Sequence, residues 1–142
     1  MKNKNILTIF FLLVCIVVYG QNGESVRVKG SWSGKMDIPD GPTITLLMHF
    51  KVSNNIIRGT FDIPEQSVKT WSMDSVWIIK DSLFAKFSNR LGDGTIYKGL
   101  FLSGLEGIDG KWVFANGATS PLKLVSTTFE FIQQSNLNPC WA

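Results

Sequence analysis

Apolar and polar residues alternate with a period of two along most of the chain after residue 29. In residues 30–38 the even positions are apolar or glycine and the odd ones are mostly polar, and residues 43–52 place Ile44, Leu46, Met48 and Phe50 on one side. Successive side chains of a strand point to opposite faces, so each stretch predicts a strand with one buried face.

Turn signals separate these stretches at regular intervals. The plainest turns are Asp40-Gly41-Pro42, Asn54-Asn55, Gly92-Asp93-Gly94 and Asn116-Gly117. Further strands are predicted at residues 57–63, 68–71, 76–80, 83–88, 97–101 and 108–114, and around Leu122 and Leu124. Eight or nine short strands without a convincing amphipathic helix predict an all-β fold, a small antiparallel up-and-down, lipocalin-like barrel.

Four glycines are each followed, two residues later, by an aromatic residue on the same face: Gly30–Trp32, Gly59–Phe61, Gly99–Phe101 and Gly110–Trp112. Glycine lets a strand bend sharply and leaves a gap that a ring from a neighbouring strand can fill. The rings expected inside are Trp32, Phe61, Tyr97, Phe101 and Trp112. They either line a cavity for a small apolar ligand or fill the barrel, and their number favours a packed interior.

The first twenty residues read as a secretory signal peptide, with Lys2 and Lys4 before an apolar run that is too short for a transmembrane span. We therefore expect export to the periplasm or beyond, a barrel domain at 21–125, and a C-terminal tail at 126–142 that can add one strand. Removing the signal leaves twelve basic against eleven acidic residues, without a basic cluster for nucleic acid or an anionic membrane. Cys140 is then the only cysteine, so no internal disulfide is expected.

Several motifs together resemble a known family. They are Gly-x-Trp-x-Gly (30–34), Gly-x-Phe-Asp-Ile-Pro-Glu-Gln (59–66), Tyr-x-Gly (97–99), Ile-x-Gly-x-Trp (108–112) and Gly-x-x-x-Pro-Leu-x-Leu (117–124). The chain resembles the small all-β N-terminal accessory domain of secreted bacterial α/β-hydrolases, with Asp62, Pro64 and Gln66 as its most distinctive loop element. The resemblance implies an accessory or binding module. We expect no hydrolase domain after Val125, as in a stand-alone version or a truncated remnant.

Catalytic motifs do not emerge from the sequence. Residues 30–34 only approach the nucleophile elbow Gly-x-Ser-x-Gly, because Trp32 stands at its centre. His49 is the single histidine and alternates with Phe50, so it is expected on the surface. One histidine and one mature cysteine cannot form an ordinary transition-metal site within a monomer.

The carboxylates around Pro39 and Pro64 leave two interpretations open. Asp37 with Asp40, and Asp62 with Glu65, would offer oxygen ligands to calcium if their loops met, but such residues more often cap turns. Asp62 and Gln66 are expected to pin the loop at one end of the barrel.

The sequence thus predicts a non-enzymatic protein without metal or cofactor. The favoured interpretation is an exported accessory or protein-interaction domain with an unknown protein partner, which uses exposed groups such as Trp71, Trp77 and the loop after Ile63. The alternative is a lipocalin-like carrier or sensor that holds a small apolar molecule inside the barrel.

Overall fold

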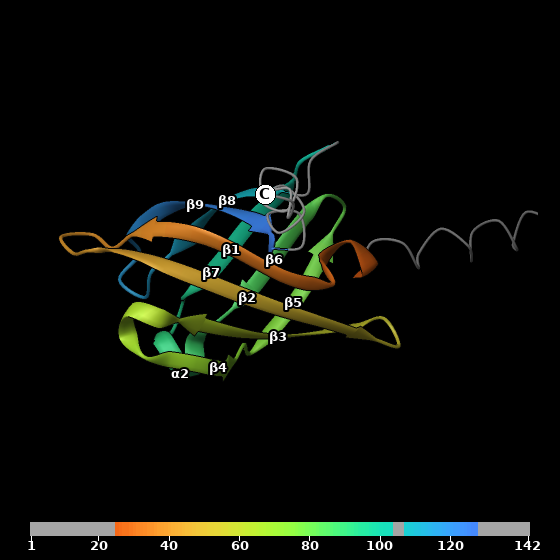
Figure 1. Cartoon of the computed structure of the whole chain (residues 1–142), viewed down its shortest axis with the longest axis horizontal. Helices are drawn as coiled ribbons and strands as arrows, with labels where there is room; N and C mark the ends of the chain where they lie inside the picture. The colour runs from red at the N-terminus through yellow and green to blue at the C-terminus, as the bar shows by residue number, and fades with distance from the viewer. Residues whose placement is uncertain (1–24, 104–106, 128–142) are drawn as a thin grey trace, which may run out of the picture.

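The computed structural model of the chain describes residues 25–103 and 107–127, most of which lie in strands (Figure 1). The predicted signal peptide, Cys140 and the tail beyond Thr127 fall outside these residues. The strands are β1 (Gly30–Asp37), β2 (Thr43–Ser53), β3 (Ile56–Ile63), β4 (Val68–Ser72), β5 (Ser75–Ile79), β6 (Ser82–Lys86), β7 (Ile96–Phe101), β8 (Gly107–Val113) and β9 (Thr119–Ser126). Three single-turn helices accompany them: η1 (Ser25–Val28), η2 (Pro64–Gln66) and α2 (Ser88–Leu91).

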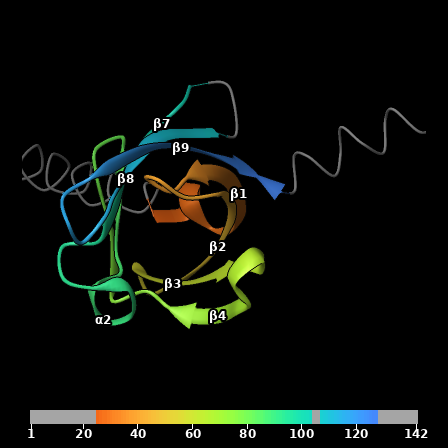
Figure 2. The same ribbon diagram turned by 90° about the vertical axis from the view of Figure 1, so that its left-hand side faces the viewer.

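The strands form one antiparallel sheet in the order β4-β3-β2-β1-β9-β8-β7-β6-β5. Its two edge strands, β4 and β5, are consecutive in the chain and only Met73 and Asp74 separate them. The sheet curls round (Figure 2), and its two edge strands follow one another through this two-residue link. The predicted all-β, barrel-like fold is confirmed.

In the part of the chain that the structure describes, only one strand pair joins distant parts of the sequence. β1 pairs with β9 through Trp32 opposite Ser126 and Ser33 opposite Val125. All other neighbours in the sheet follow one another along the chain. The curled sheet thus consists of two meanders, β1–β4 and β5–β9, which are joined by the pairing of β1 with β9.

The Asn54-Asn55 turn is formed as expected. Both residues have positive φ, 50° and 61°, and they connect Ser53 directly to its partner Ile56. A two-residue hairpin turn of this kind requires the left-handed region, which asparagine tolerates well. The turn fixes the β2–β3 register and thereby decides which side chains meet on both faces.

The inner face of the sheet carries the core. The five rings expected inside are all buried, with exposed fractions between 0 % and 8 %. Phe87, which the sequence interpretation did not single out, connects two of them: its ring centroid lies 5.0 Å from that of Phe61 and 4.5 Å from that of Trp112. Trp32 packs edge-on against Phe101 at 6.5 Å.

The strand predicted at residues 83–88 is shorter in the structure. It ends at Lys86, and the chain then forms the single turn of α2. The backbone N–H of Leu91 donates to the carbonyl oxygen of Phe87 at 2.9 Å, so Phe87 starts this turn while its ring stays in the core. Among the described helices, none has the length and apolar character needed to cross a membrane.

Candidate functional site

Inside the sheet, Tyr97 occupies the space beside two facing glycines. Gly99 lies opposite Gly110 in the β7–β8 register. A Cβ atom would stand 2.5 Å from the Tyr97 hydroxyl if added at Gly99, and 2.6 Å from it if added at Gly110. The hydroxyl donates to the carbonyl oxygen of Leu122 at 3.2 Å. Burial raises the pKa of Tyr97, so its hydroxyl stays protonated and remains a donor.

The chain also leaves no room for a side chain at Gly34 and Gly59. A Cβ added at Gly34 would meet the backbone carbonyl oxygen of Lys123 first and then the side chains of Leu122 and Leu124, and a Cβ added at Gly59 would meet the Met73 sulfur. Backbone and side chains of the protein itself therefore take up the space beside these glycines. Two hollows occur among the described residues whose lining includes none of the five rings, although the buried Met73 lines one of them.

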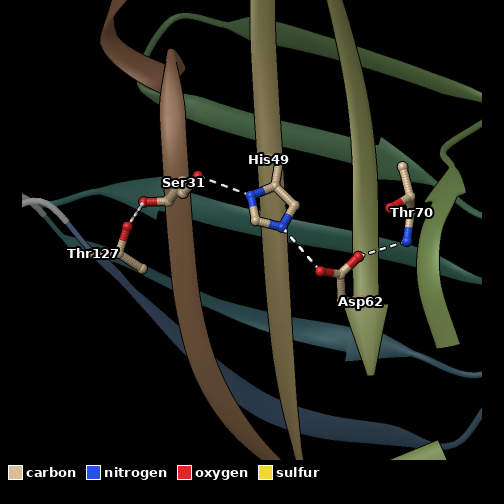
Figure 3. A network of polar contacts seen from close by, with 5 residues as sticks. All are labelled: Ser31, His49, Asp62, Thr70 and Thr127. Carbon is tan, nitrogen blue, oxygen red and sulfur yellow. Dashed lines mark hydrogen bonds and ion pairs between the residues drawn. The ribbon is translucent and has the colours of Figure 1, made fainter. Parts of the chain in front are cut away.

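On the outer face, three polar side chains from neighbouring strands form a row (Figure 3). This polar row consists of Ser31 on β1, His49 on β2 and Asp62 on β3. Ser31 Oγ lies 2.8 Å from His49 Nδ1, and His49 Nε2 lies 3.2 Å from Asp62 Oδ2. The exposed fractions of the His49 and Asp62 side chains are 37 % and 19 %, so the row is only partly shielded from water.

Asp62 also ties β3 to β4. Its Oδ1 accepts the backbone N–H of Thr70 at 2.6 Å, next to the register shift between Phe61 and Ile63. Thr70 has φ +57°, a costly conformation for a β-branched residue that the surrounding contacts must maintain. The Thr70 N–H, followed by His49, holds the pKa of Asp62 below its ordinary value. Asp62 is thus an ionised acceptor shared by three strands.

At its other end the polar row reaches β9. The hydroxyl of Thr127 donates to the carbonyl oxygen of Ser31 at 3.1 Å, just after β9 ends (Figure 3). The row and its two flanking residues therefore connect β9, β1, β2, β3 and β4. These side chains brace the outer face across five strands.

The polar row also brings a serine hydroxyl next to a histidine, the pair of groups that nucleophilic catalysis uses. In the tautomer that satisfies both contacts, His49 Nε2–H donates to Asp62 while Nδ1 accepts from Ser31, as a base does beside a nucleophile. Acyl transfer also needs oxyanion donors and a place for the substrate. Ser31 lies within the continuous β1–β2 pairing rather than on a strained turn, and it lines neither hollow.

Beside the polar row, a groove of about 660 Å³ opens where β3 and β5 diverge. We call it the seam groove. Ile57, Met73 and Val76 supply apolar surface, and Met73 is buried. Lys51, Arg58 and Thr70 add polar groups to its lining. His49 also lines this groove, so it lies directly beside the polar row.

The predicted loop element, Asp62, Pro64 and Gln66, is divided between β3 and η2. Pro64 begins η2 and Gln66 ends it, and both are exposed. Glu65 attaches this turn to β2, because its Oε1 accepts the backbone N–H of Thr45 at 2.9 Å. Hydrogen bonding by Thr45 lowers the pKa of Glu65.

The four carboxylates considered for calcium have separate surroundings. Asp62 and Glu65 accept hydrogen bonds from different segments, and Asp37 accepts one from the Thr43 hydroxyl. In residues 25–103 and 107–127, no three His, Cys, Asp or Glu side chains form a group that could hold a metal ion.

The two tryptophans expected to be exposed, Trp71 and Trp77, pack on neighbouring rings, and Trp71 lies opposite the inward-facing Phe61. Trp77 stacks on Phe84 with ring centroids 5.4 Å apart, and Trp71 meets Phe61 edge-on at 6.1 Å. Arg90 covers the Trp71 ring at 5.3 Å. Both indoles are half-buried rather than fully presented to solvent.

The fold and site thus define a barrel-like all-β domain with a filled interior and an outer face that carries a polar row and a groove. No protein-family model matches this chain, and no curated protein matches it.

Proposed function

We propose that this protein is an exported, non-catalytic interaction module that contacts a protein partner through the outer face of β2–β4 and the seam groove. The observation that carries the proposal is the filling of the interior. Tyr97, Met73, Leu122 and Leu124 occupy space beside Gly34, Gly59, Gly99 and Gly110, which leaves the outer surface as the place for recognition. The resemblance to hydrolase accessory domains supports the same role.

The alternative is a carrier that holds a small apolar molecule among the five inner rings. Such a protein requires these rings to separate around the ligand. A screen of fatty acids, sterols, haem-like rings and short glycans tests this by thermal shift and tryptophan fluorescence, because a ligand of the folded state raises the melting temperature. We expect no saturable shift. A saturable shift with quenching of inner tryptophans would replace our proposal with the carrier.

A matched variant separates binding inside from binding outside. Replacing Trp77 and Trp141 by phenylalanine leaves the buried Trp32 and Trp112, and Trp71, which packs edge-on against Phe61, as the fluorophores. Quenching that persists in the double variant arises at tryptophans that contact the core, whereas quenching that disappears arises outside the core. Only the first result supports the carrier.

The polar row favours a second candidate function, hydrolysis by Ser31 with His49 as base. Two observations favour a bracing role instead: Asp62 divides its oxygens between His49 and Thr70, and Ser31 lies outside the seam groove. Hydrolysis of an activated ester, compared between the wild type and Ser31→Ala, separates these functions.

A further inference from the structure

The seam groove lies between two strand edges that lack a partner strand. β3 pairs with β2 from Ile56 onward, but its pairing with β4 involves only Thr60 and later residues. β5 pairs with β6 and ends the strand order of the described sheet. Residues 56–58 and the outer edge of β5 therefore have no partner strand among the described residues. Such edges readily accept an added strand.

The two edges meet at one end of the groove. The backbone N–H of Met73 donates to the carbonyl oxygen of Gly59 at 2.9 Å. Beyond this contact the strands diverge, and the groove of about 660 Å³ lies within the range of ordinary ligand sites. Ile56 on β3 and Ile79 on β5 are 58 % and 56 % exposed. Exposed isoleucines on unpaired edges offer apolar contact to an incoming chain.

Charge in the groove favours an acidic occupant. Lys51 lies directly opposite Arg58 in the β2–β3 register, where like charges repel each other. Both side chains are exposed, and neither forms an ion pair within residues 25–103 and 107–127. The nearby carboxylate of Asp74 already accepts the backbone N–H of Asn89 at 3.0 Å. A carboxylate from outside would relieve the repulsion between Lys51 and Arg58.

We propose that the seam groove binds an extended acidic segment of a partner protein, which adds as a strand to residues 56–58 of β3. Alternate side chains of a strand point to opposite faces, so one set would contact Ile57 and Met73 while the acidic set lies beside Arg58 and Lys51. This inference rests on the proposed function, because it names the chemistry of the partner that the outer face receives.

The test uses a labelled, blocked peptide that alternates valine and glutamate over about seven residues, an ordinary strand length. Fluorescence anisotropy at low salt measures its binding to the full exported protein. We expect saturable binding that weakens about tenfold or more when lysine replaces glutamate in the peptide. A third peptide with prolines at alternate positions retains the acidic residues but loses backbone donors, and it is expected to bind more weakly.

Two charge-reversal variants give the matched comparison. Arg58→Glu changes the groove, whereas Lys98→Glu makes the same kind of change on β7, outside it. Arg58→Glu is expected to weaken binding of the acidic peptide about tenfold or more, and Lys98→Glu to leave it nearly unchanged. Equal losses in both variants, or no binding to the wild type, would overturn the inference. Circular dichroism verifies that both variants are folded.

Other occupants give different results. Binding of dodecanoate without binding of the peptide would assign the groove to an amphipathic carboxylate. Self-association that Arg58→Glu abolishes would assign it to a second copy of the chain. Either outcome overturns the acidic-segment inference. The proposed function fails by a separate result, an apolar ligand that quenches the inner tryptophans, so the two failures are distinguishable.

Discussion

Different atoms limit the space beside a glycine at two places in the sheet. One place is the wall formed by β7 and β8, and the other is the seam between β3 and β5. In the wall the register is continuous from Ile96 opposite Val113 to Phe101 opposite Ile108. A Cβ added at Gly110 would lie 2.5 Å from the carbonyl oxygen of Lys98. The backbone of β7 therefore leaves no room for a side chain at Gly110. At the seam, the atom nearest to a Cβ added at Gly59 would be the sulfur of Met73, near the far end of a flexible side chain. We infer that the wall is rigid and that the seam can adjust to a partner.

Among the variants that test this contrast between wall and seam, Trp112→Ala is expected to lower the free energy of unfolding the most. Trp112 is 2 % exposed and packs on Phe87, so its truncation leaves a cavity in the rigid region. We expect a loss of about 3–5 kcal/mol in the free energy of unfolding, measured by urea denaturation. The half-buried Trp77 is the control, and its replacement by alanine is expected to cost clearly less. Similar losses for both would contradict a solidly packed interior.

The next effect compares two glycines directly. Gly110→Ala forces a methyl group against backbone and is expected to destabilise the protein by about 1–3 kcal/mol. Gly59→Ala is expected to cost less, because the Met73 side chain can move aside. Urea denaturation of both variants measures the difference. If Gly59→Ala proves the more damaging, the seam is as rigid as the wall.

Variants of Asp62 test how much its hydrogen bond to the Thr70 N–H contributes to attaching β4 to β3. Asp62→Ala leaves the Thr70 N–H without its acceptor, and a loss of about 1–2 kcal/mol is expected. The charge is tested with Asp62→Asn. Because the folded protein lowers the pKa of Asp62, this stabilisation is fully present above the ordinary value of 3.8 and disappears as the pH falls through the lowered value.

The measurement is the difference in unfolding free energy between the wild type and Asp62→Asn across this pH range. We expect the difference to shrink towards low pH. Asp109→Asn, which alters an exposed carboxylate on β8, controls for general charge effects. If the difference in unfolding free energy does not change with pH, the charge of Asp62 does not contribute to the attachment of β4.

The smallest effect is expected from Ser31→Ala. The variant loses one partly exposed hydrogen bond to His49, which is worth about 0.5–1 kcal/mol. Hydrolysis of p-nitrophenyl acetate is expected to proceed at the same rate with the wild type and the variant. A loss of hydrolysis in Ser31→Ala, together with labelling of Ser31 by a fluorophosphonate, would make the polar row an active site.

Local patterns in the sequence were sufficient to predict most strands and the inner face. Alternation placed Leu46 and Phe61 inside, and it placed His49 and Asp62 on the opposite face. Their contact depends on register, which the Asn54-Asn55 hairpin sets and which was within reach of sequence reasoning. The link to Ser31 depends on a second register, across the longer turn between β1 and β2.

The seam could not be predicted in this way. Its groove results from a bend at Met73 and Asp74 that lets one continuous stretch pair first with β3 and then with β6. Residues 68–71 and 76–80 read as two ordinary strands, and no local signal indicates that an edge is left open between them. Curvature and closure belong to the whole sheet.

The short pairing between β1 and β9 also has a consequence for how the chain folds. Every other strand pair of the described sheet is local, so each meander can form early from neighbouring hairpins at a small cost in loop-closure entropy. Pairing Trp32 with Ser126 brings together residues near opposite ends of the described domain. We therefore expect this closure to be the slow step of folding, and variants along β1 and β9 to alter the folding rate more than variants within either meander.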